Sequence, residues 1–192
     1  QNAAISWTHY FSDALEATFS AGQDAYDFQV EGEDNPLNAY QYRFDIRQQF
    51  IKANFRQEKG DRHLFTYGVH GIHYQLNPGE IVPFGSASGV IADKVAAERA
   101  LDWSIYFGDE FEINEQWAVS GGLRYNLYTY LGPQTLPIYA AGAPFLAENS
   151  IGERSYAAGE PVKTYHGPEF RFSGRYALSN GSSFKAGINS MR

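Results

Sequence analysis

The sequence has no cysteine, only one methionine and no hydrophobic run long enough for a membrane-spanning helix. Without cysteine there are no disulfides and no thiolate metal sites. Mean hydropathy is only −0.43, although 43% of the 192 residues are hydrophobic, so apolar residues must be interleaved with polar ones. Basic residues are also scarce: 15 Lys and Arg stand against 22 Asp and Glu. The resulting net charge of −7 argues against a nucleic-acid partner.

Aromatic residues are abundant, with 14 Tyr and 14 Phe, and apolar residues alternate strictly with polar ones. One arm carries Leu101, Trp103, Ile105 and Phe107; after a turn at residues 114–116, the next carries Trp117, Val119, Gly121, Leu123, Tyr125 and Leu127. Each arm runs for roughly a dozen residues, whereas strands of soluble proteins average about five or six. A strand that crosses a bilayer in a barrel needs about nine to eleven, with lipid-facing and lumen-facing residues alternating. The alternation therefore predicts transmembrane β-strands.

The connections between the arms follow a regular order. Short turns are expected near Ser12, Glu58, Asn114 and Ser179, where the Asn180-Gly181 dipeptide is a strong hairpin signal. The other connections are longer, at residues 31–38, 77–100 and 132–165. This order predicts one all-β segment over residues 1–192: an antiparallel, up-and-down transmembrane β-barrel wall of about eight strands. The short turns would be periplasmic, and the loops at 77–100 and 132–165 extracellular.

Four local features follow from the same reading. In the third arm the apolar parity changes between residues 40–46 and residues 51–55, which predicts a β-bulge near Arg47 to Gln49. Residues 93–100 (DKVAAERA) contain good helix formers and predict a short surface helix. The proline-containing stretch 132–159 is expected to be irregular but ordered. Alternation does not determine which way residues 63–76 face.

No arrangement of residues typical of an enzyme is present. His70 and His73 are three residues apart, so in a strand they point to opposite faces and do not form a chelate. Asp109, Glu110 and Glu112 are interpreted as a solvated strand end. Walker, dinucleotide and zinc signatures are absent. We therefore predict a protein that is not an enzyme and has no cofactor and no metal site.

Two groups of side chains are candidates for contact with a transported or enclosed molecule. The first consists of basic residues interleaved with the apolar face: Arg43, Arg124, Arg171, Arg175 and Lys185. They are predicted to line the lumen, as a charged path, as a contact for a plug, or paired with neighbours such as Asp45 and Glu169. The second group consists of the loop aromatics Phe84, Tyr139, Phe145 and Tyr156, which would either contact a ligand or pack the loops together.

Several stretches resemble a known family when they are taken in succession. They are ERALDWSIYFGDEFEI (98–113), WAVSGGLRY (117–125), GPEFRFSGRY (167–176) and SFKAGINSMR (183–192). Short pieces such as GLRY occur in many barrel strands, but the ordered series resembles the mid-barrel of TonB-dependent outer-membrane receptors of Bacteroidetes type. These stretches cover 45 of the 192 residues, and the strand rhythm extends to the whole chain.

The resemblance implies a bacterial outer-membrane protein that binds a scarce nutrient at its extracellular face and imports it. Such receptors have a barrel of about 22 strands, a plug domain inside it, and a segment that contacts TonB; neither plug nor TonB segment is recognisable here. The implied partners are outer-membrane lipid, TonB and the plug through the rest of the receptor, a surface lipoprotein, and a siderophore, cobalamin, glycan or peptide. Sequence alone does not select among these nutrients.

Two other readings stay open at this stage. One is a self-contained eight-stranded outer-membrane barrel with an adhesion or structural role. The other is a soluble β-barrel that binds a small apolar ligand, with aromatics inside and Arg124, Arg171 and Arg175 outside. The chain begins with Gln1 and its last strand lacks a terminal aromatic residue, so we expect the native protein to be longer.

Overall fold

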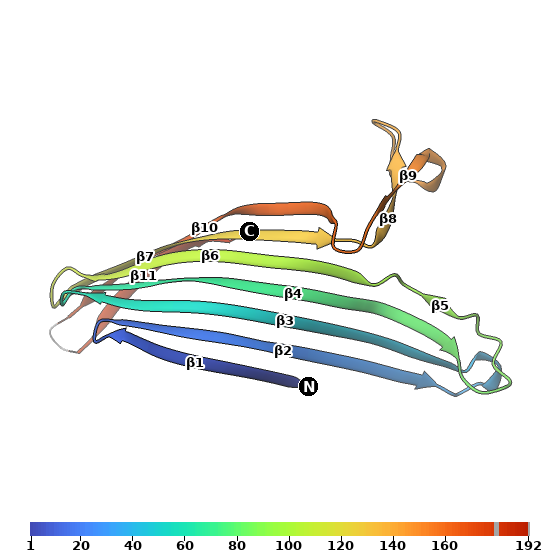
Figure 1. The fold of residues 1–192 in the computed structure, drawn as a ribbon, viewed down its shortest axis with the longest axis horizontal. Coiled ribbons are helices and arrows are strands. Elements are labelled where there is room, and N and C mark those ends of the chain that lie inside the picture. Colours follow the sequence, from blue (N-terminus) through green and yellow to red (C-terminus); the bar gives the residue numbers. More distant parts are fainter. Residues whose placement is uncertain (179–180, 192) are drawn as a thin grey trace.

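The computed structural model describes residues 1–178 and 181–191 and consists mainly of one antiparallel sheet (Figure 1). Eight long strands follow the order β1-β2-β3-β4-β6-β7-β10-β11. Their bounds are β1 Asn2–Ser12, β2 Leu15–Gly32, β3 Tyr40–Lys59, β4 His63–Pro83, β6 Glu98–Glu112, β7 Trp117–Leu131, β10 Pro161–Ala177 and β11 Ser183–Ser190. Short β5 (Asp93–Lys94) pairs with β4, and β8 (Gln134–Tyr139) with β9 (Ser150–Tyr156). The predicted meander of eight long strands is confirmed.

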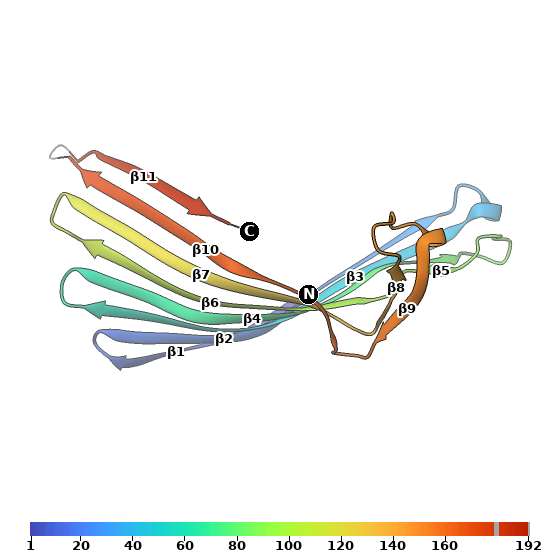
Figure 2. The same cartoon turned by 90° about the horizontal axis from the view of Figure 1, so that it is seen from above.

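The strands form a single twisted layer with β1 and β11 at its two edges (Figure 2). One end of the sheet carries the tight turns, including the turn at Gly60, whose φ of 61° suits glycine; we call it the short-turn end. The opposite, long-loop end carries the β4–β6 connection and the β8–β9 hairpin. The two 3-10 turns, Pro36–Asn38 and Ala147–Asn149, also lie in loops there. In the described ranges, no helix is long and apolar enough to cross a membrane.

Odd-numbered residues of β1, β2, β3, β6 and β7, and of β4 as far as Asn77, share one face, which we call the apolar face. Its rings contact one another from strand to strand: Trp7 with Phe19, Phe19 with Phe55, Phe55 with Tyr67, and Tyr67 with Phe107. The register continues the row through Leu123 to Phe170. Residues 63–76, whose facing the sequence leaves open, place Phe65, Tyr67 and Val69 on this face, opposite Asp109, Phe107 and Ile105.

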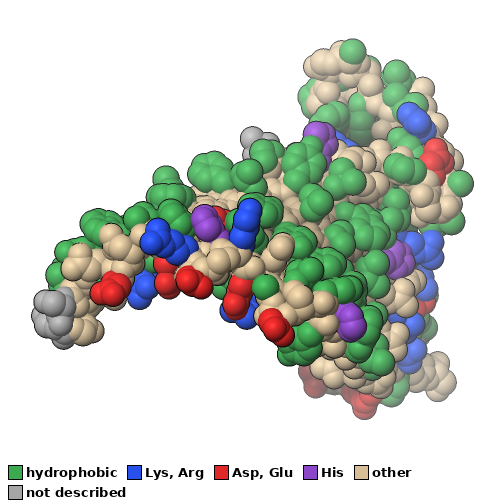
Figure 3. Space-filling model, turned by 60° about the vertical axis from the view of Figure 1, so that its left-hand side comes forward, with side chains coloured by type: hydrophobic (Ala, Val, Ile, Leu, Met, Phe, Trp, Pro, Cys, Tyr) green, Lys and Arg blue, Asp and Glu red, His purple; other side chains and the backbone are tan. Residues whose placement is uncertain are grey.

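The sheet has almost no hydrophobic core. Among the described residues, the buried apolar side chains are three alanines and Leu131, and no large side chain is fully buried. By contrast, Ile5 is 74% exposed, Ile105 64% and Leu123 63%. Figure 3 shows the hydrophobic side chains over the outer side of the arched sheet and charged side chains along its hollowed edge. Because an exposed apolar surface of this extent is unfavourable in water, the apolar face requires a covering of lipid or protein.

The sheet does not close on itself. In the part of the chain that the structure describes, β1 pairs only with β2 and β11 only with β10. The reading as a self-contained eight-stranded barrel is therefore wrong for this arrangement, and so is the soluble closed barrel with an aromatic interior. Two unpaired strand edges also require further strands as neighbours.

The parity change in β3 has a different cause from the one predicted. The β2–β3 register runs without interruption from Leu15–Gln57 to Gly32–Tyr40, so there is no bulge at Arg47 to Gln49. The register shift lies instead on the β4 side, between Arg43–Glu80 and Asp45–Asn77. Because β3 alternates without a break, its apolar residues change face: Tyr42, Phe44 and Ile46 lie on the side opposite to Ile51 and Ala53.

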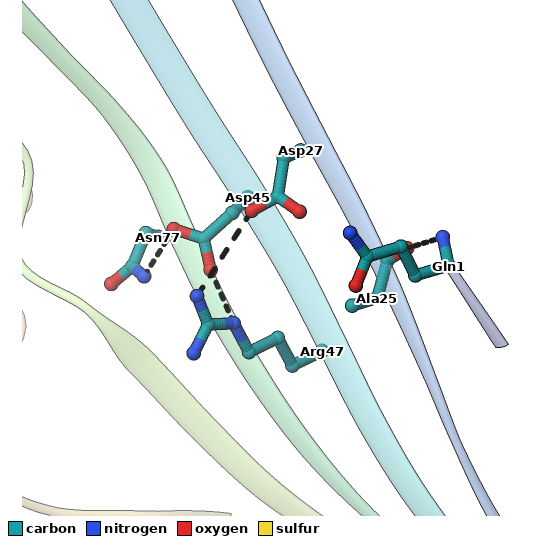
Figure 4. A network of polar contacts seen from close by, with 6 residues as sticks. All are labelled: Gln1, Ala25, Asp27, Asp45, Arg47 and Asn77. Carbon is teal, nitrogen blue, oxygen red and sulfur yellow. Dashed lines mark hydrogen bonds and ion pairs between the residues drawn. The ribbon is translucent and has the colours of Figure 1, made fainter. Parts of the chain in front are cut away.

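A polar network occupies the apolar-face side of the strands where this change takes place (Figure 4). Arg47 lies 3.4 Å from Asp45 and 4.0 Å from Asp27, and Asn77 donates a 2.6 Å hydrogen bond to Asp45. At the neighbouring edge, the Gln1 ammonium donates to the Ala25 carbonyl at 2.7 Å. The apolar face therefore ends in charged and amide side chains toward the long-loop end.

The two long connections differ from the prediction. β4 continues through Pro83 and β6 begins at Glu98, so the first loop spans 84–97 instead of 77–100. The predicted helix at 93–100 is wrong: Asp93 and Lys94 pair with β4, and residues 98–100 join the ladder opposite residues 74–76. Sheet pairing overrides their helix propensity. The second connection, residues 132–160, contains the β8–β9 hairpin where irregular structure was expected. The predicted turn residues Ser179 and Asn180 lie outside the described residues.

Candidate functional site on the polar face

The face opposite the apolar one carries hydroxyl, amide and charged side chains, and we call it the polar face. Cross-strand hydrogen bonds join Ser6 to Ser20, Thr8 to Thr18, and Ser120 to Ser173, at 2.8, 3.0 and 2.8 Å. Each pair faces its partner directly in the register, so each bond supports the strand pairing.

Arg124, one of the residues predicted to line a lumen, lies on this face near the middle of β7. It donates from Nε to Asn126 and from a terminal nitrogen to Ser104, both at 2.8 Å. Its register partners are Tyr106 and Glu169, and the Tyr106 hydroxyl donates to Asn54 at 2.8 Å. These bonds fix the guanidinium on the sheet instead of leaving it to project freely.

Arg171 and Arg175 lie further toward the short-turn end of the same face. The Arg171 side chain lies over two glycines: a Cβ added to Gly122 would be 3.1 Å from its Nε, and one added to Gly108 3.6 Å from a terminal nitrogen. The absence of side chains at these positions leaves the guanidinium room to lie flat. Arg175 faces Lys185 and, with acidic residues of neighbouring strands, lines a hollow. The charged lining comprises Arg56, Glu58, Asp61, Arg62, Glu110, Glu112, Arg175 and Lys185.

Arg43 is not part of this group. It has the same parity as Asp45 and Arg47 in an unbroken strand and pairs with Glu80 of β4. The prediction that it lines the polar face is therefore wrong, because it depended on a bulge that the structure does not contain. Asp45 also has a different partner from the one considered, since its ion pair is with Arg47.

The histidines and the acidic cluster are dispersed. His70 faces Lys52 and Ser104 on the polar face, whereas His73 faces Gln49 and Leu101 on the other, as alternation predicts. Asp109 differs from its two acidic neighbours: Glu110 and Glu112 are exposed, but Asp109 lies on the apolar face, half-buried, 2.8 Å from Nδ1 of His63. The His63 ring stacks on Phe111 at 4.3 Å. The interpretation as a solvated strand end holds for the glutamates only.

Toward the long-loop end the polar face becomes aromatic, a feature that sequence analysis missed. We call this region the aromatic rim; it comprises Tyr26, Phe28, Tyr42, Phe44, Tyr74, Tyr128, Tyr130 and Tyr165. Phe44 contacts Tyr26, Phe28 and Tyr42, with ring centroids 5.8, 5.1 and 6.3 Å apart. The signal that could have revealed the rim is the parity change at residues 42–51, read as a change of face instead of a bulge.

The four predicted loop aromatics do not form one cluster. Tyr139 and Phe145 contact each other in the β8–β9 region at 5.1 Å, with Phe145 83% exposed. Tyr156, at the end of β9, lies beneath the Arg154 guanidinium at 4.7 Å. Phe84 follows β4, where its backbone donates to Ala39, and it has no ring contact within the described ranges. Tyr139 and Tyr156 thus take part in loop packing, whereas Phe145 is presented outward.

In a comparison with solved structures, this curved sheet is similar to parts of two transport proteins. The copper transporter OprC matches with a TM-score of 0.71 at 11% identity, over 98% of this chain and 30% of its own. An open form of the ferric-catecholate import receptor Fiu from E. coli K12 matches with a TM-score of 0.53 at 13% identity, over 98% of this chain and 34% of its own. The sheet has the fold of a wall of TonB-dependent receptor barrels. At this level of identity the likeness concerns the fold alone.

The chain spans about a third of the length of these two structures. No protein-family model matches it, and no curated protein does either. The two unpaired edge strands, β1 and β11, are consistent with this partial match, since a wall of a larger barrel has neighbouring strands on both sides. In outer-membrane barrels generally, the polar face of the wall lines the interior and the apolar face contacts lipid.

Proposed function

We propose that this chain is part of the barrel of a TonB-dependent outer-membrane receptor that binds a scarce nutrient at its extracellular face and imports it. The observation that carries the proposal is the combination of a receptor-like fold with an exposed apolar face and almost no core. A sheet of this composition is stable only where lipid covers one face and the barrel interior hydrates the other.

The height of the apolar band supports a membrane position. On β6 this face runs from Leu101 to Phe111, about 33 Å along a strand at about 3.3 Å per residue, with Asp109 beside His63 as its one charged residue. With a strand tilt of about 45°, this corresponds to a height of about 23 Å, close to the band of about 25 Å found in outer-membrane barrels. The short turns would then be periplasmic, and the loops at 84–97 and 132–160 extracellular.

The remainder of the receptor would supply the plug, the TonB-contacting segment and the other strands. Arg124, Arg171 and Arg175 would line the lumen, and Phe84, Tyr139, Phe145 and Tyr156 would contribute to the mouth. The Bacteroidetes-type assignment and the surface lipoprotein partner rest on the sequence motifs alone, since the matched receptor Fiu comes from E. coli K12. The candidate nutrient classes are siderophore, cobalamin, glycan and peptide, and the growth experiment below distinguishes among them.

Growth under nutrient limitation tests this proposal. A strain that lacks the full-length receptor is grown with each nutrient class in turn at limiting concentration. We expect slow growth on one class only, restored by the intact receptor but not by a receptor whose TonB-contacting segment is deleted. Normal growth on every class, or restoration without the TonB-contacting segment, would contradict energy-coupled import.

A further inference from the structure

One carboxylate beside the aromatic rim, Asp102, has His70, Tyr74 and Tyr128 as its electrostatic neighbours. Asp102 of β6 lies half-buried between Ile72 of β4 and Tyr128 of β7. Within residues 1–178 and 181–191 it forms no ion pair and no hydrogen bond. Because no protein group among these residues occupies this carboxylate, it is available to form a charge-assisted hydrogen bond with a cationic ligand.

Tyrosine rings surround this carboxylate. Tyr128 faces Asp102 directly and contacts Tyr165, with ring centroids 6.5 Å apart. The next polar-face residue of β6 is Ala100, whose register partners are Tyr74 on one side and Tyr130 on the other. Gln134 donates to the Tyr130 hydroxyl at 2.7 Å and so ties this ring to the second long connection.

The arrangement is a small residue, Ala100, flanked by two tyrosines, with Glu98 before it and Asp102 after it on the same face of β6. Ala100 is only 3% exposed, because the neighbouring side chains stand above it. Ring faces attract cations through the π-electron quadrupole, most strongly where water is excluded. A carboxylate at the edge of the rings adds charge-assisted hydrogen bonds.

The long-loop end as a whole carries a negative net charge, like the carboxylates of Asp102 and Glu98. Residues 24–47, 75–102 and 128–165 contain 13 acidic and 6 basic residues, so this end carries the entire net charge of −7. The rest of the chain is balanced. A negative field over an entrance raises the local concentration of cations and lowers that of anions.

From this combination we propose that the aromatic rim around Asp102 binds an organic cation: an ammonium or guanidinium group carried on an apolar or aromatic body. The inference rests on the proposed function, since it specifies the chemistry of the ligand that the receptor mouth accepts. Asp102 pairs with the cationic group, and Tyr74, Tyr128 and Tyr130 surround it.

Titration of the full-length receptor with benzyltrimethylammonium tests the proposal. The binding isotherm is measured by calorimetry in detergent, with benzenesulfonate as an anionic aromatic probe of similar size. We expect benzyltrimethylammonium to bind and benzenesulfonate not to bind. Asp102→Asn, which removes the charge and keeps the shape, is expected to weaken binding of the cation at least tenfold, and Tyr128→Leu about fivefold.

Glu110→Gln is the matched control, because Glu110 lies on the same face of the same strand near the short-turn end. It is expected to leave the affinity unchanged. Unchanged affinity in Asp102→Asn, or equal binding of benzenesulfonate, would overturn the proposal. The proposal is also overturned if Asp102→Asn makes the plug sensitive to protease while probe affinity stays constant, since the carboxylate would then pair with the plug. Nutrient-limited growth that still requires the TonB-contacting segment, without probe binding, would refute this inference alone.

Discussion

Replacement of Ile5 by Arg is expected to lower the free energy of unfolding of the complete barrel by about 2–4 kcal/mol, as for Arg on the lipid face at the bilayer midplane. Ile5 is 74% exposed on the apolar face, and seven residues separate it from the turn after Ser12. Most of this cost arises because the guanidinium would have to enter hydrocarbon. Lost protein contacts contribute little to it. Urea-dependent folding into phospholipid vesicles measures the difference.

Ser6→Arg is the control for this prediction, because Ser6 is the next residue of the same strand and points to the polar face, where it bonds to Ser20. We expect it to cost no more than about 1 kcal/mol, the value of one exposed hydrogen bond. If both arginine variants destabilised the barrel equally, the assignment of the two faces would be wrong.

A second large effect is expected from Gly68→Val, which should destabilise the barrel by about 2–3 kcal/mol through overpacking. A Cβ at residue 68 would collide with the carbonyl oxygen of Ala53 in β3 and would meet the Tyr106 hydroxyl at 2.9 Å. The backbone oxygen cannot move without breaking the β3–β4 ladder. Displacement of Tyr106 would in addition break its bond to Asn54.

Gly174→Val is the matched variant for Gly68→Val. Gly174 is also a strand glycine, but no atom lies within 4 Å of the position its Cβ would take, outside its own chain neighbours. We expect this change to be close to neutral, since valine favours strands. Heat-dependent unfolding followed by electrophoretic mobility measures both variants. A similar midpoint for both would show that the close approach at Gly68 has no energetic consequence.

Much of the fold could be predicted because one physical rule dominates it. Strands with one apolar and one polar face must alternate, so Leu101 to Phe107 and Trp117 to Leu127 show their facing directly in the sequence. The same rule placed Arg124, Arg171 and Arg175 on the polar face. The rule needs no knowledge of distant contacts, because the odd or even position of a residue along its strand determines which face of the sheet its side chain is on.

The rule failed where the strands extend beyond the apolar band. At residues 42–46 the surroundings reverse: the aromatic residues lie on the inner side and Asp45 and Arg47 on the outer side, so the parity change resembled a bulge. Residues 93–100 favoured a helix locally, but their strand state depends on pairing with residues 74–81, which local propensity does not describe. The aromatic rim was missed for the same reason, since its members come from strands far apart in sequence.

The central claim is that this sheet is one wall of a larger, plugged outer-membrane barrel. The most direct test is the intact mass of the native protein purified from outer membranes, with peptide mapping on both sides of this segment. The account predicts a mass several times the 21.5 kDa of this chain, with further strands and a plug sequence flanking it. A mass close to 21.5 kDa would contradict it, because the two open edges and the apolar face would then have no partner within the protein.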